Sequence, residues 1–261
     1  MLFHGSYTAL LTPFKDNKVD FDAYRKLIDF QIDNGTHGLV PVGTTGESPT
    51  LSHDEHKKLV EVCIEQSNRR VPVIAGAGSN STNEAVDFVK HACSAGADGL
   101  LIVTPYYNKP TQSGLIAHYN ELIKNSSKPI IIYDIPGRSV IKMSDATMAK
   151  LAENELIAGV KDATADLARP TRLQNLIGDD FIQLSGEDGT ALAYLAAGGH
   201  GCISVTANIA PKLLSSMHNA WKQGDITTAQ EINKKLMPLH DALFYETSPG
   251  PLKYAASLLG L

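Results

Sequence analysis

The feature that most constrains the fold is a series of eight short apolar runs separated by longer amphipathic segments. Because the runs are apolar throughout rather than alternating with polar residues, they are typical of parallel strands covered by helices. Eight successive strand–helix units favour an α/β fold, a (β/α)8 or TIM barrel, over an open doubly wound sheet. The predicted strands are 6–11, 38–42, 72–77, 99–104, 129–133, 157–161, 181–185 and 201–205.

Local signals between the runs support helices. Ser52 with Glu55, and Ser81 with Glu84, each form a capping-box pattern before an apolar periodic segment. No Gly-x-Gly-x-x-Gly follows the first strand, which disfavours a dinucleotide-binding fold. Two further helical segments, 225–243 and 251–259, come after the eighth unit. We therefore expect a catalytic barrel over residues 1–224 and a short C-terminal helical appendage over residues 225–261.

Composition excludes several classes of function. A net charge of -5 argues against an extended nucleic-acid surface. No apolar run reaches membrane-spanning length, and no signal-peptide pattern opens the chain, so we expect no membrane partner. The three cysteines (Cys63, Cys93 and Cys202) are scattered and form neither a disulfide framework nor a zinc pattern. These features predict a cytoplasmic protein with reduced thiols.

The run that ends at Lys161 is the strongest functional signal. In a strand, Ile157, Gly159 and Lys161 share one face, because side chains alternate. A lysine at the mouth of a barrel core is partly desolvated, and burial favours the neutral amine that attacks carbonyl groups. When this segment is considered alone, the alternative is a lysine at a strand end that simply reaches water.

Other polar groups follow neighbouring strands at the same end of the barrel, where chemistry in this fold takes place. The segment Gly43-Thr-Thr-Gly-Glu-Ser48 offers backbone N–H groups and the hydroxyls of Thr44 and Thr45 to a small carboxylate. A plain glycine turn leading into a helix is the alternative. The segment Thr104-Pro-Tyr-Tyr-Asn-Lys-Pro110 places Tyr106 and Tyr107 in a loop, for proton relay, an interface or simple aromatic packing.

The fifth strand ends in a second reactive group. Tyr133 has the same parity as Ile131 and is expected to face inward, where a phenol can pass protons to a lysine-bound intermediate. Arg138 follows it, and its planar guanidinium suits a carboxylate, although a surface ion pair is equally compatible. An inward lysine and tyrosine, a carboxylate-binding loop and an arginine at one mouth indicate imine chemistry on a 2-oxo acid.

Two weaker signals concern ions. His53 and His56 lie three residues apart on a predicted helix, but they match neither standard zinc motif and lack a third ligand, so we expect no metal. The segment Gly186-Glu-Asp-Gly189 follows the seventh strand, where phosphate often binds in such barrels, and its two acids argue against phosphate.

Five segments together closely resemble the dihydrodipicolinate synthases, now called 4-hydroxy-tetrahydrodipicolinate synthases, in order and along essentially the whole chain. They are Gly43-Thr-Thr-Gly-Glu-Ser48, Thr104-Pro-Tyr-Tyr-Asn-Lys-Pro110, Tyr133 with Pro136-Gly-Arg138, Gly159-Val-Lys-Asp162, and Gly199-His-Gly-Cys-Ile-Ser-Val-Thr-Ala-Asn208.

The resemblance implies a lyase of lysine biosynthesis that condenses pyruvate with L-aspartate 4-semialdehyde and needs no organic cofactor. Lys161 would carry the pyruvate imine, and Tyr133 would transfer protons through a relay of Thr44 and Tyr107. The implied substrate-binding positions are Thr45 for the pyruvate carboxylate, Arg138 for the semialdehyde carboxylate, and Ile203 and Gly186 in the pocket.

The resemblance also implies assembly and regulation. The second tyrosine of the pair, Tyr107, would reach into the neighbouring subunit's site, so a dimer is the smallest complete unit and a homotetramer the expected assembly. Lysine-inhibited members bind lysine at the tight dimer interface. The positions of this sequence that match that site are Ser48, His53, His56, Asn80, Glu84 and Tyr106.

Departures from the family pattern and two rival functions accompany this interpretation. Asp134 and Ser139 stand where many members have asparagine and threonine, and the family normally continues for several helical turns beyond Leu261. One rival is another pyruvate aldolase, such as N-acetylneuraminate lyase or a 2-keto-3-deoxy sugar acid aldolase. Arg138 disfavours it, since a sugar chain offers no carboxylate there. The other is a silent lysine-binding scaffold, which would not need Lys161 and Tyr133.

Overall fold

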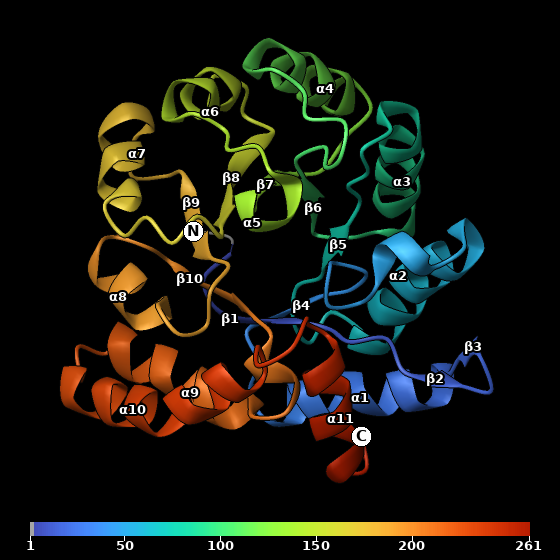
Figure 1. Cartoon of the computed structure of the whole chain (residues 1–261), viewed down its shortest axis with the longest axis vertical. Helices are drawn as coiled ribbons and strands as arrows, with labels where there is room; N and C mark the ends of the chain where they lie inside the picture. The colour runs from blue at the N-terminus through green and yellow to red at the C-terminus, as the bar shows by residue number, and fades with distance from the viewer. Residues whose placement is uncertain (1–2) are drawn as a thin grey trace.

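The protein is a barrel of parallel strands, as the computed structural model shows for residues 3–261 (Figure 1). The barrel closes where the two end strands of the sheet, β4 and β5, meet. Its sheet runs in the order β4-β1-β10-β9-β8-β7-β6-β5, and a parallel bridge between Leu39 and Val73 joins the two ends. The strands are β1 (Gly5–Ala9), β4 (Gly38–Val40), β5 (Ile74–Gly76), β6 (Gly99–Val103), β7 (Ile130–Asp134), β8 (Ile157–Asp162), β9 (Ile182–Ser185) and β10 (Gly201–Ser204). The predicted (β/α)8 barrel is confirmed.

Helices form an outer ring around the strands in Figure 1. The Ser52–Glu55 capping box is present. At Ser81 only half of the predicted box forms: Ser81 accepts the backbone N–H of Glu84, but the Glu84 carboxylate bonds to Ser79 and His53 instead. The ring helices are α1 (Phe21–Asp33), α2 (His53–Ser67), α3 (Thr82–Ala95), α4 (Gln112–Lys124), α6 (Asp145–Ala152), α7 (Arg169–Ile177), α8 (Ala191–Ala196) and α9 (Pro211–Lys222).

Two apolar cores lie on the two sides of the strand wall. The inner core fills the barrel and includes Leu101, Ile131, Leu184 and Ile203. The outer core lies between strands and helices, and the two sets alternate along the strands as period two requires, except at one point on β8. Polar groups at the strand ends therefore face a closed, side-chain-filled barrel rather than a pore.

One prediction about strand faces is wrong. Ile157 does not share the face of Lys161, because it packs in the outer core while Ala158 packs against the inner one. The register explains this: Ile130 pairs with Ile157, but the next residue, Ile131, pairs with Gly159. The extra residue is a β-bulge that shifts the alternation by one.

Short elements add to the predicted pattern. β2 (Phe14–Lys15) and β3 (Lys18–Val19) form an antiparallel hairpin outside the barrel, with Asp16 and Asn17 in the left-handed region at its turn. Single turns η1 (Ser48–Thr50), η2 (Thr206–Asn208) and α5 (Pro136–Ser139) follow the ends of strands β4, β10 and β7. In Figure 1, α5 lies across the barrel opening.

Two C-terminal helices follow the eighth unit, as the sequence predicts. α10 (Ile226–Ala242) packs along α9, and α11 (Gly250–Leu258) returns toward the barrel near η2. The division of the chain into units at residues 224 and 225 stays a prediction. Within residues 3–261, every helix is too short or too polar to cross a membrane.

Candidate active site

The centre of the candidate site is the pair Tyr133 and Lys161 on adjacent strands. They are in-register partners at the carboxyl ends of β7 and β8. The Lys161 Nζ lies 4.1 Å from the centroid of the Tyr133 ring, and each residue is 5% exposed. Both side chains therefore face the barrel interior, as predicted, rather than reaching bulk water. An ammonium over a tyrosine face is attracted by the ring quadrupole, which helps to hold the pair together.

The loop after β4 carries the two candidate threonines beside this end of the barrel. Thr45 is buried and Thr44 half-buried. The loop is held by its own backbone, since Gly46 and Glu47 donate to the carbonyls of Gly43 and Thr44 over 3.1 Å each. These bonds hold the backbone that carries the two threonines in one conformation, which suits the binding of a small anion.

The end of β9 approaches the end of β8 closely. Gly186 donates its N–H to the Asp162 carbonyl over 2.7 Å, and a Cβ at this position would lie 2.8 Å from the Cβ of Ala163. A side chain there would push the strand end away from Lys161. Ile203, on β10, is fully buried in the inner core. Both predicted lining positions thus lie on the barrel strands or directly after them.

The two acids after Gly186 have different surroundings. Burial raises the pKa of the Glu187 carboxyl, and the positive charge of Lys161 partly opposes that shift. Asp188 accepts the backbone N–H groups of Val205 and Thr206, at 2.8 and 3.1 Å, and the Ser204 hydroxyl. Asp188 thereby occupies the donors that a phosphate would need, which agrees with the expectation of no phosphate site.

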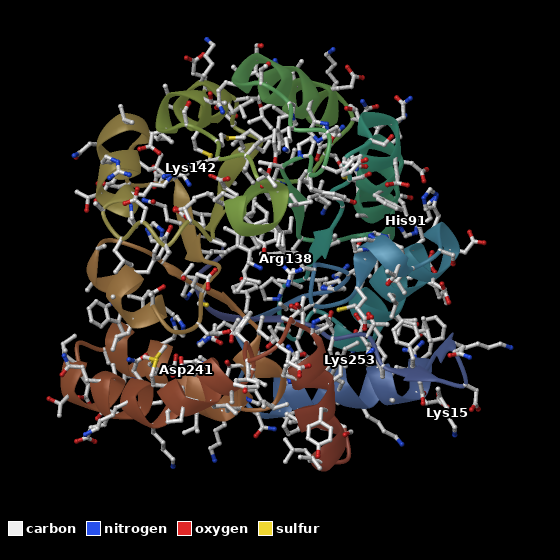
Figure 2. The ribbon with its side chains drawn as sticks, in the orientation of Figure 1. Lys15, His91, Arg138, Lys142, Asp241 and Lys253 are labelled. Carbon is white, nitrogen blue, oxygen red and sulfur yellow. The ribbon has the colours of Figure 1, made fainter. Side chains whose placement is uncertain are left out.

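Arg138 lies on α5, at the middle of the barrel opening in Figure 2. Its side chain is exposed, and its Nη2 donates to the carbonyl of Ser248 over 3.1 Å. Nearby, the Lys253 ammonium of α11 pairs with the Glu47 carboxylate over 2.6 Å. The C-terminal segment therefore contacts both the arginine turn and the threonine loop.

The tyrosines after β6 differ from Tyr133 in their exposure. Tyr107 is 87% exposed and has a φ of 71°, in the left-handed region that a bulky residue seldom adopts. Tyr106 is half-buried beside Ser79 and Asn80. The single chain places Tyr107 outside its own barrel interior, unlike Tyr133 and Lys161.

A separate polar cluster joins α2 to α3 and contains three of the six predicted lysine-site positions: His53, His56 and Glu84. The Nε2 of His53 lies 2.6 Å from the Glu84 carboxylate, which also accepts the Ser79 hydroxyl. His56 is 2% exposed and stacks on Phe88 with a centroid distance of 3.9 Å. Among the described residues, neither ring nitrogen of His56 has a hydrogen-bond partner, and burial lowers its pKa to about 4.

Of the remaining lysine-site positions, Asn80 and Tyr106 lie beside this cluster. The Asn80 carbonyl accepts the side-chain amide of Asn108 over 2.9 Å, and burial raises the pKa of Tyr106. Ser48 is half-buried at the start of η1. Across residues 3–261, no group of three or more His, Cys, Asp or Glu side chains is arranged to hold a metal ion.

The sequence reasoning missed the residues that lie behind the Tyr133–Lys161 pair. Arg169 is fully buried at the start of α7 and pairs with Asp134 at 2.7 Å and Asp162 at 3.4 Å. Burial raises the pKa of the Asp134 carboxyl, against the guanidinium of Arg169, which lowers it. The sequence does contain a sign of this cluster. Asp134 and Asp162 each follow an inward-facing residue, so both must lie on the outer, buried face of the strands, where they need a cationic partner.

The barrel with a buried lysine–tyrosine pair at its carboxyl end defines a class of protein, the barrel enzymes that act on carbonyl compounds through a lysine amine. The particular family follows from comparison with known proteins. The model of the Dihydrodipicolinate synthetase family matches residues 2–261, and the chain belongs to this family.

Curated relatives named 4-hydroxy-tetrahydrodipicolinate synthase agree. The chain is 61% identical over 260 residues to the protein of Acidiphilium cryptum, covering 99% of this chain and 89% of that one. It is 60% identical over 258 residues to the protein of Bradyrhizobium diazoefficiens, covering 99% and 87%.

Solved structures show the same fold. A chloride-inhibited dihydrodipicolinate synthase from Acinetobacter baumannii, complexed with pyruvate, matches with a TM-score of 0.95 and 43% identity over 98% of this chain and 89% of that chain. The enzyme from Cyanidioschyzon merolae with lysine bound matches with a TM-score of 0.96 and 37% identity over 99% and 89%. A monomeric dihydrodipicolinate synthase variant matches with a TM-score of 0.96 and 41% identity over 99% and 88%.

Proposed function

We propose that this enzyme condenses pyruvate with L-aspartate 4-semialdehyde to give 4-hydroxy-tetrahydrodipicolinate in lysine biosynthesis. The observation that carries the proposal is the buried pair of Lys161 and Tyr133, with 4.1 Å between the amine and the ring centroid. The family and the names of relatives about 60% identical point to the same reaction.

The chemistry begins at the amine of Lys161. Its nitrogen attacks the ketone carbon of pyruvate, and the resulting carbinolamine loses water to form an imine. The cationic nitrogen then accepts electrons as the methyl carbon loses a proton, which gives an enamine. The enamine carbon bonds to the aldehyde carbon of the semialdehyde. Finally the amino group of that substrate displaces the Lys161 nitrogen, closing the ring and freeing the lysine, with one water released overall.

The proposed sequence needs proton transfers, and in this proposal Tyr133 carries them. A positioned general acid or base contributes typically 10²–10⁴-fold. We assign Tyr133 to this role and Thr44 and Tyr107 to the relay that connects it to solvent. The buried Lys161 and Tyr133 come from one chain, whereas the exposed Tyr107 is available to a second copy.

We assign the substrate carboxylates to two separate positions. Thr45 and its loop hold the pyruvate carboxylate beside Lys161. Arg138 holds the semialdehyde carboxylate at the barrel opening, since a guanidinium binds a carboxylate with two parallel hydrogen bonds. Gly186 and Ile203 complete the pocket, and the close approach of Gly186 to Ala163 leaves room only for a glycine there.

The active assembly in this proposal is a homodimer at minimum and a tetramer as the full form, located in the cytoplasm. The exposure of Tyr107 supports a site completed by a neighbouring subunit. One related structure is described as a monomeric variant. Sedimentation of the purified protein across a concentration series tests the proposal, and a monomer with full activity would contradict it.

We also propose that lysine inhibits the enzyme by binding at the α2–α3 cluster. Glu84 supplies a carboxylate for an ammonium group, and His56 supplies ring nitrogens that have no partner among the described residues. A relative of the same fold has been solved with lysine bound. His53 is part of this cluster, and we assign Ser48, Asn80 and Tyr106 to the same lysine site.

Borohydride trapping followed by a two-substrate assay tests the reaction. Pyruvate with borohydride should add one stable mass at Lys161 alone, and labelling elsewhere would remove its assigned role. Turnover is then measured with pyruvate plus aspartate semialdehyde and, in parallel, pyruvate plus N-acetylmannosamine. Turnover only with N-acetylmannosamine would identify a sugar acid aldolase, and trapping without any turnover would point to a fault at the second-substrate position.

A further inference from the structure

The residues behind the reacting pair form a buried charged cluster that the proposed chemistry does not use. Asp134 and Asp162 immediately follow Tyr133 and Lys161, and they are register partners on β7 and β8. Because side chains alternate along a strand, the two acids point away from the barrel interior, on the opposite side of the wall from the pair. Both are buried.

Arg169 joins these two acids. Its Nη1 donates to the Asp134 carboxylate over 2.7 Å and lies 3.4 Å from the Asp162 carboxylate. Its Nη2 donates to the Met143 carbonyl over 2.8 Å, and its Nε to the Asp145 carboxylate over 2.9 Å. All three nitrogens of the guanidinium are thus engaged, in the planar, forked geometry that only arginine offers.

The acids also fix the backbone on either side of the pair. The Asp134 carboxylate accepts the N–H of Met143 over 3.3 Å, and the Asp162 carboxylate accepts the N–H of Thr164 over 2.9 Å. The Asp134 carbonyl accepts the N–H of Ala163 over 2.9 Å. The cluster therefore ties the end of β7 to the end of β8 at the residues next to Tyr133 and Lys161.

We propose that Arg169 is a positioning residue for the imine-forming step, because it binds Asp134 and Asp162 together and thereby fixes the separation of Tyr133 and Lys161. The inference rests on the proposed function. Arg169 does not touch the reacting atoms, and it acts through the strand ends. Without the guanidinium, two neighbouring buried carboxylates repel each other, and the strand ends that carry the pair separate.

The test compares Arg169→Met with a variant that removes the charge imbalance as well. Arg169→Met should slow the formation of the trapped pyruvate imine about 100-fold, the loss expected from a misplacement of about 1 Å. The pyruvate KM should change little, because the threonine loop is untouched. The double variant Asp134→Asn/Arg169→Met retains only one of the two facing carboxylates and should recover thermal stability while imine formation stays slow.

Two controls separate positioning from general stability. Arg172→Met removes an exposed arginine that pairs with Asp145 and Asp166, and it should leave imine formation unchanged. Asp134→Asn alone keeps an acceptor for Arg169 and should retain most of the rate. If the double variant recovers both stability and rate, Arg169 is only structural and the inference is overturned.

A second readout needs no substrate. Exchange of the Ala163 amide hydrogen, which reports the β7–β8 junction, should speed up in the double variant and not in Arg172→Met. Unchanged exchange at Ala163 overturns the positioning role even if the wild type fails to trap pyruvate. Failure of wild-type trapping with faster exchange in the double variant would instead remove the proposed function and leave the junction role standing.

Discussion

Two polar regions of this barrel contrast in how completely one chain satisfies them. At the β7–β8 junction, the lysine–tyrosine pair is buried and a single arginine compensates the two acids behind it. At the face formed by α2, α3 and the loop after β6, Tyr107 is exposed and the ring nitrogens of His56 have no partner among residues 3–261. In the first region the polar groups find their partners within one chain. In the second region Tyr107 and His56 have groups free to bind a second subunit or a ligand.

The largest expected effect comes from Lys161→Met. Removal of the nucleophile should lower turnover by about 10⁴-fold or more, as for other covalent catalysts. Pyruvate and borohydride should then add no mass to the protein. Lys142→Met is the matched control, since this exposed lysine only pairs with Asp166, and it should trap pyruvate normally. Undiminished turnover in Lys161→Met would place the chemistry elsewhere.

Tyr107 provides the sharpest test of the comparison. Tyr107→Phe should lower turnover, and mixing it with inactive Lys161→Met subunits should restore part of the activity. The restoration is expected because a mixed dimer contains one site with an intact lysine and a tyrosine from its partner. Turnover is measured after joint refolding of the two variants. If the mixture stays as slow as its parts, Tyr107 works within its own chain.

Regulation should depend on the second region and leave the first unaffected. Glu84→Gln keeps the size of the side chain but removes the charge offered to the ammonium of lysine. A hydrogen bond to a charged group contributes about 1.5–3 kcal/mol, so the half-inhibitory lysine concentration should rise about 10- to 100-fold. Turnover without lysine should stay near the wild-type value. Inhibition that is unchanged in this variant would exclude Glu84 from the lysine site.

A further prediction concerns acid stability at His56, away from the reacting groups. Its folded pKa of about 4 lies below its ordinary value of 6.5. Between these values the unfolded chain binds the extra proton, so the free energy of unfolding falls as the pH drops from 6.5 to 4. The contribution of this residue is at most about 3 kcal/mol.

His56→Phe tests this dependence while keeping an aromatic ring against Phe88. Chemical denaturation at several pH values should show a shallower fall in stability than in the wild type. The slope should not vanish, because burial also lowers the pKa of His118 to about 4 and that of His218 to about 3. An unaltered slope would mean that His56 is not desolvated in solution.

The barrel was predictable from the sequence because short, continuously apolar runs are typical of parallel strands that are buried on both faces. All eight strands were found, with ends that differ from the structure by a few residues. The hairpin of β2 and β3 was missed because each strand has only two residues. Its turn signal was present, since Asp16 and Asn17 both tolerate the left-handed conformation found there.

The candidate site was predictable only in part. Tyr133 and Lys161 carry chemistry that their residue types reveal, and strand parity placed Tyr133 correctly. Strand parity places Asp134 and Asp162 together on a buried outer face, but nothing in the sequence identifies Arg169 as the cation that pairs with them. The wrong assignment of Ile157 has a similar origin. A bulge depends on how two strands pair, and one strand read alone does not show it.

That bulge has a consequence for how the barrel tolerates change. Ile157, the β8 residue before Ala158, packs in the outer core with the helices, whereas Lys161, beyond the bulge, faces the interior. The side chains before and after the bulge therefore follow separate alternations. If a residue is gained or lost before Ala158, the bulge can absorb the change. The start of the strand can then shift while Lys161 keeps pointing into the barrel.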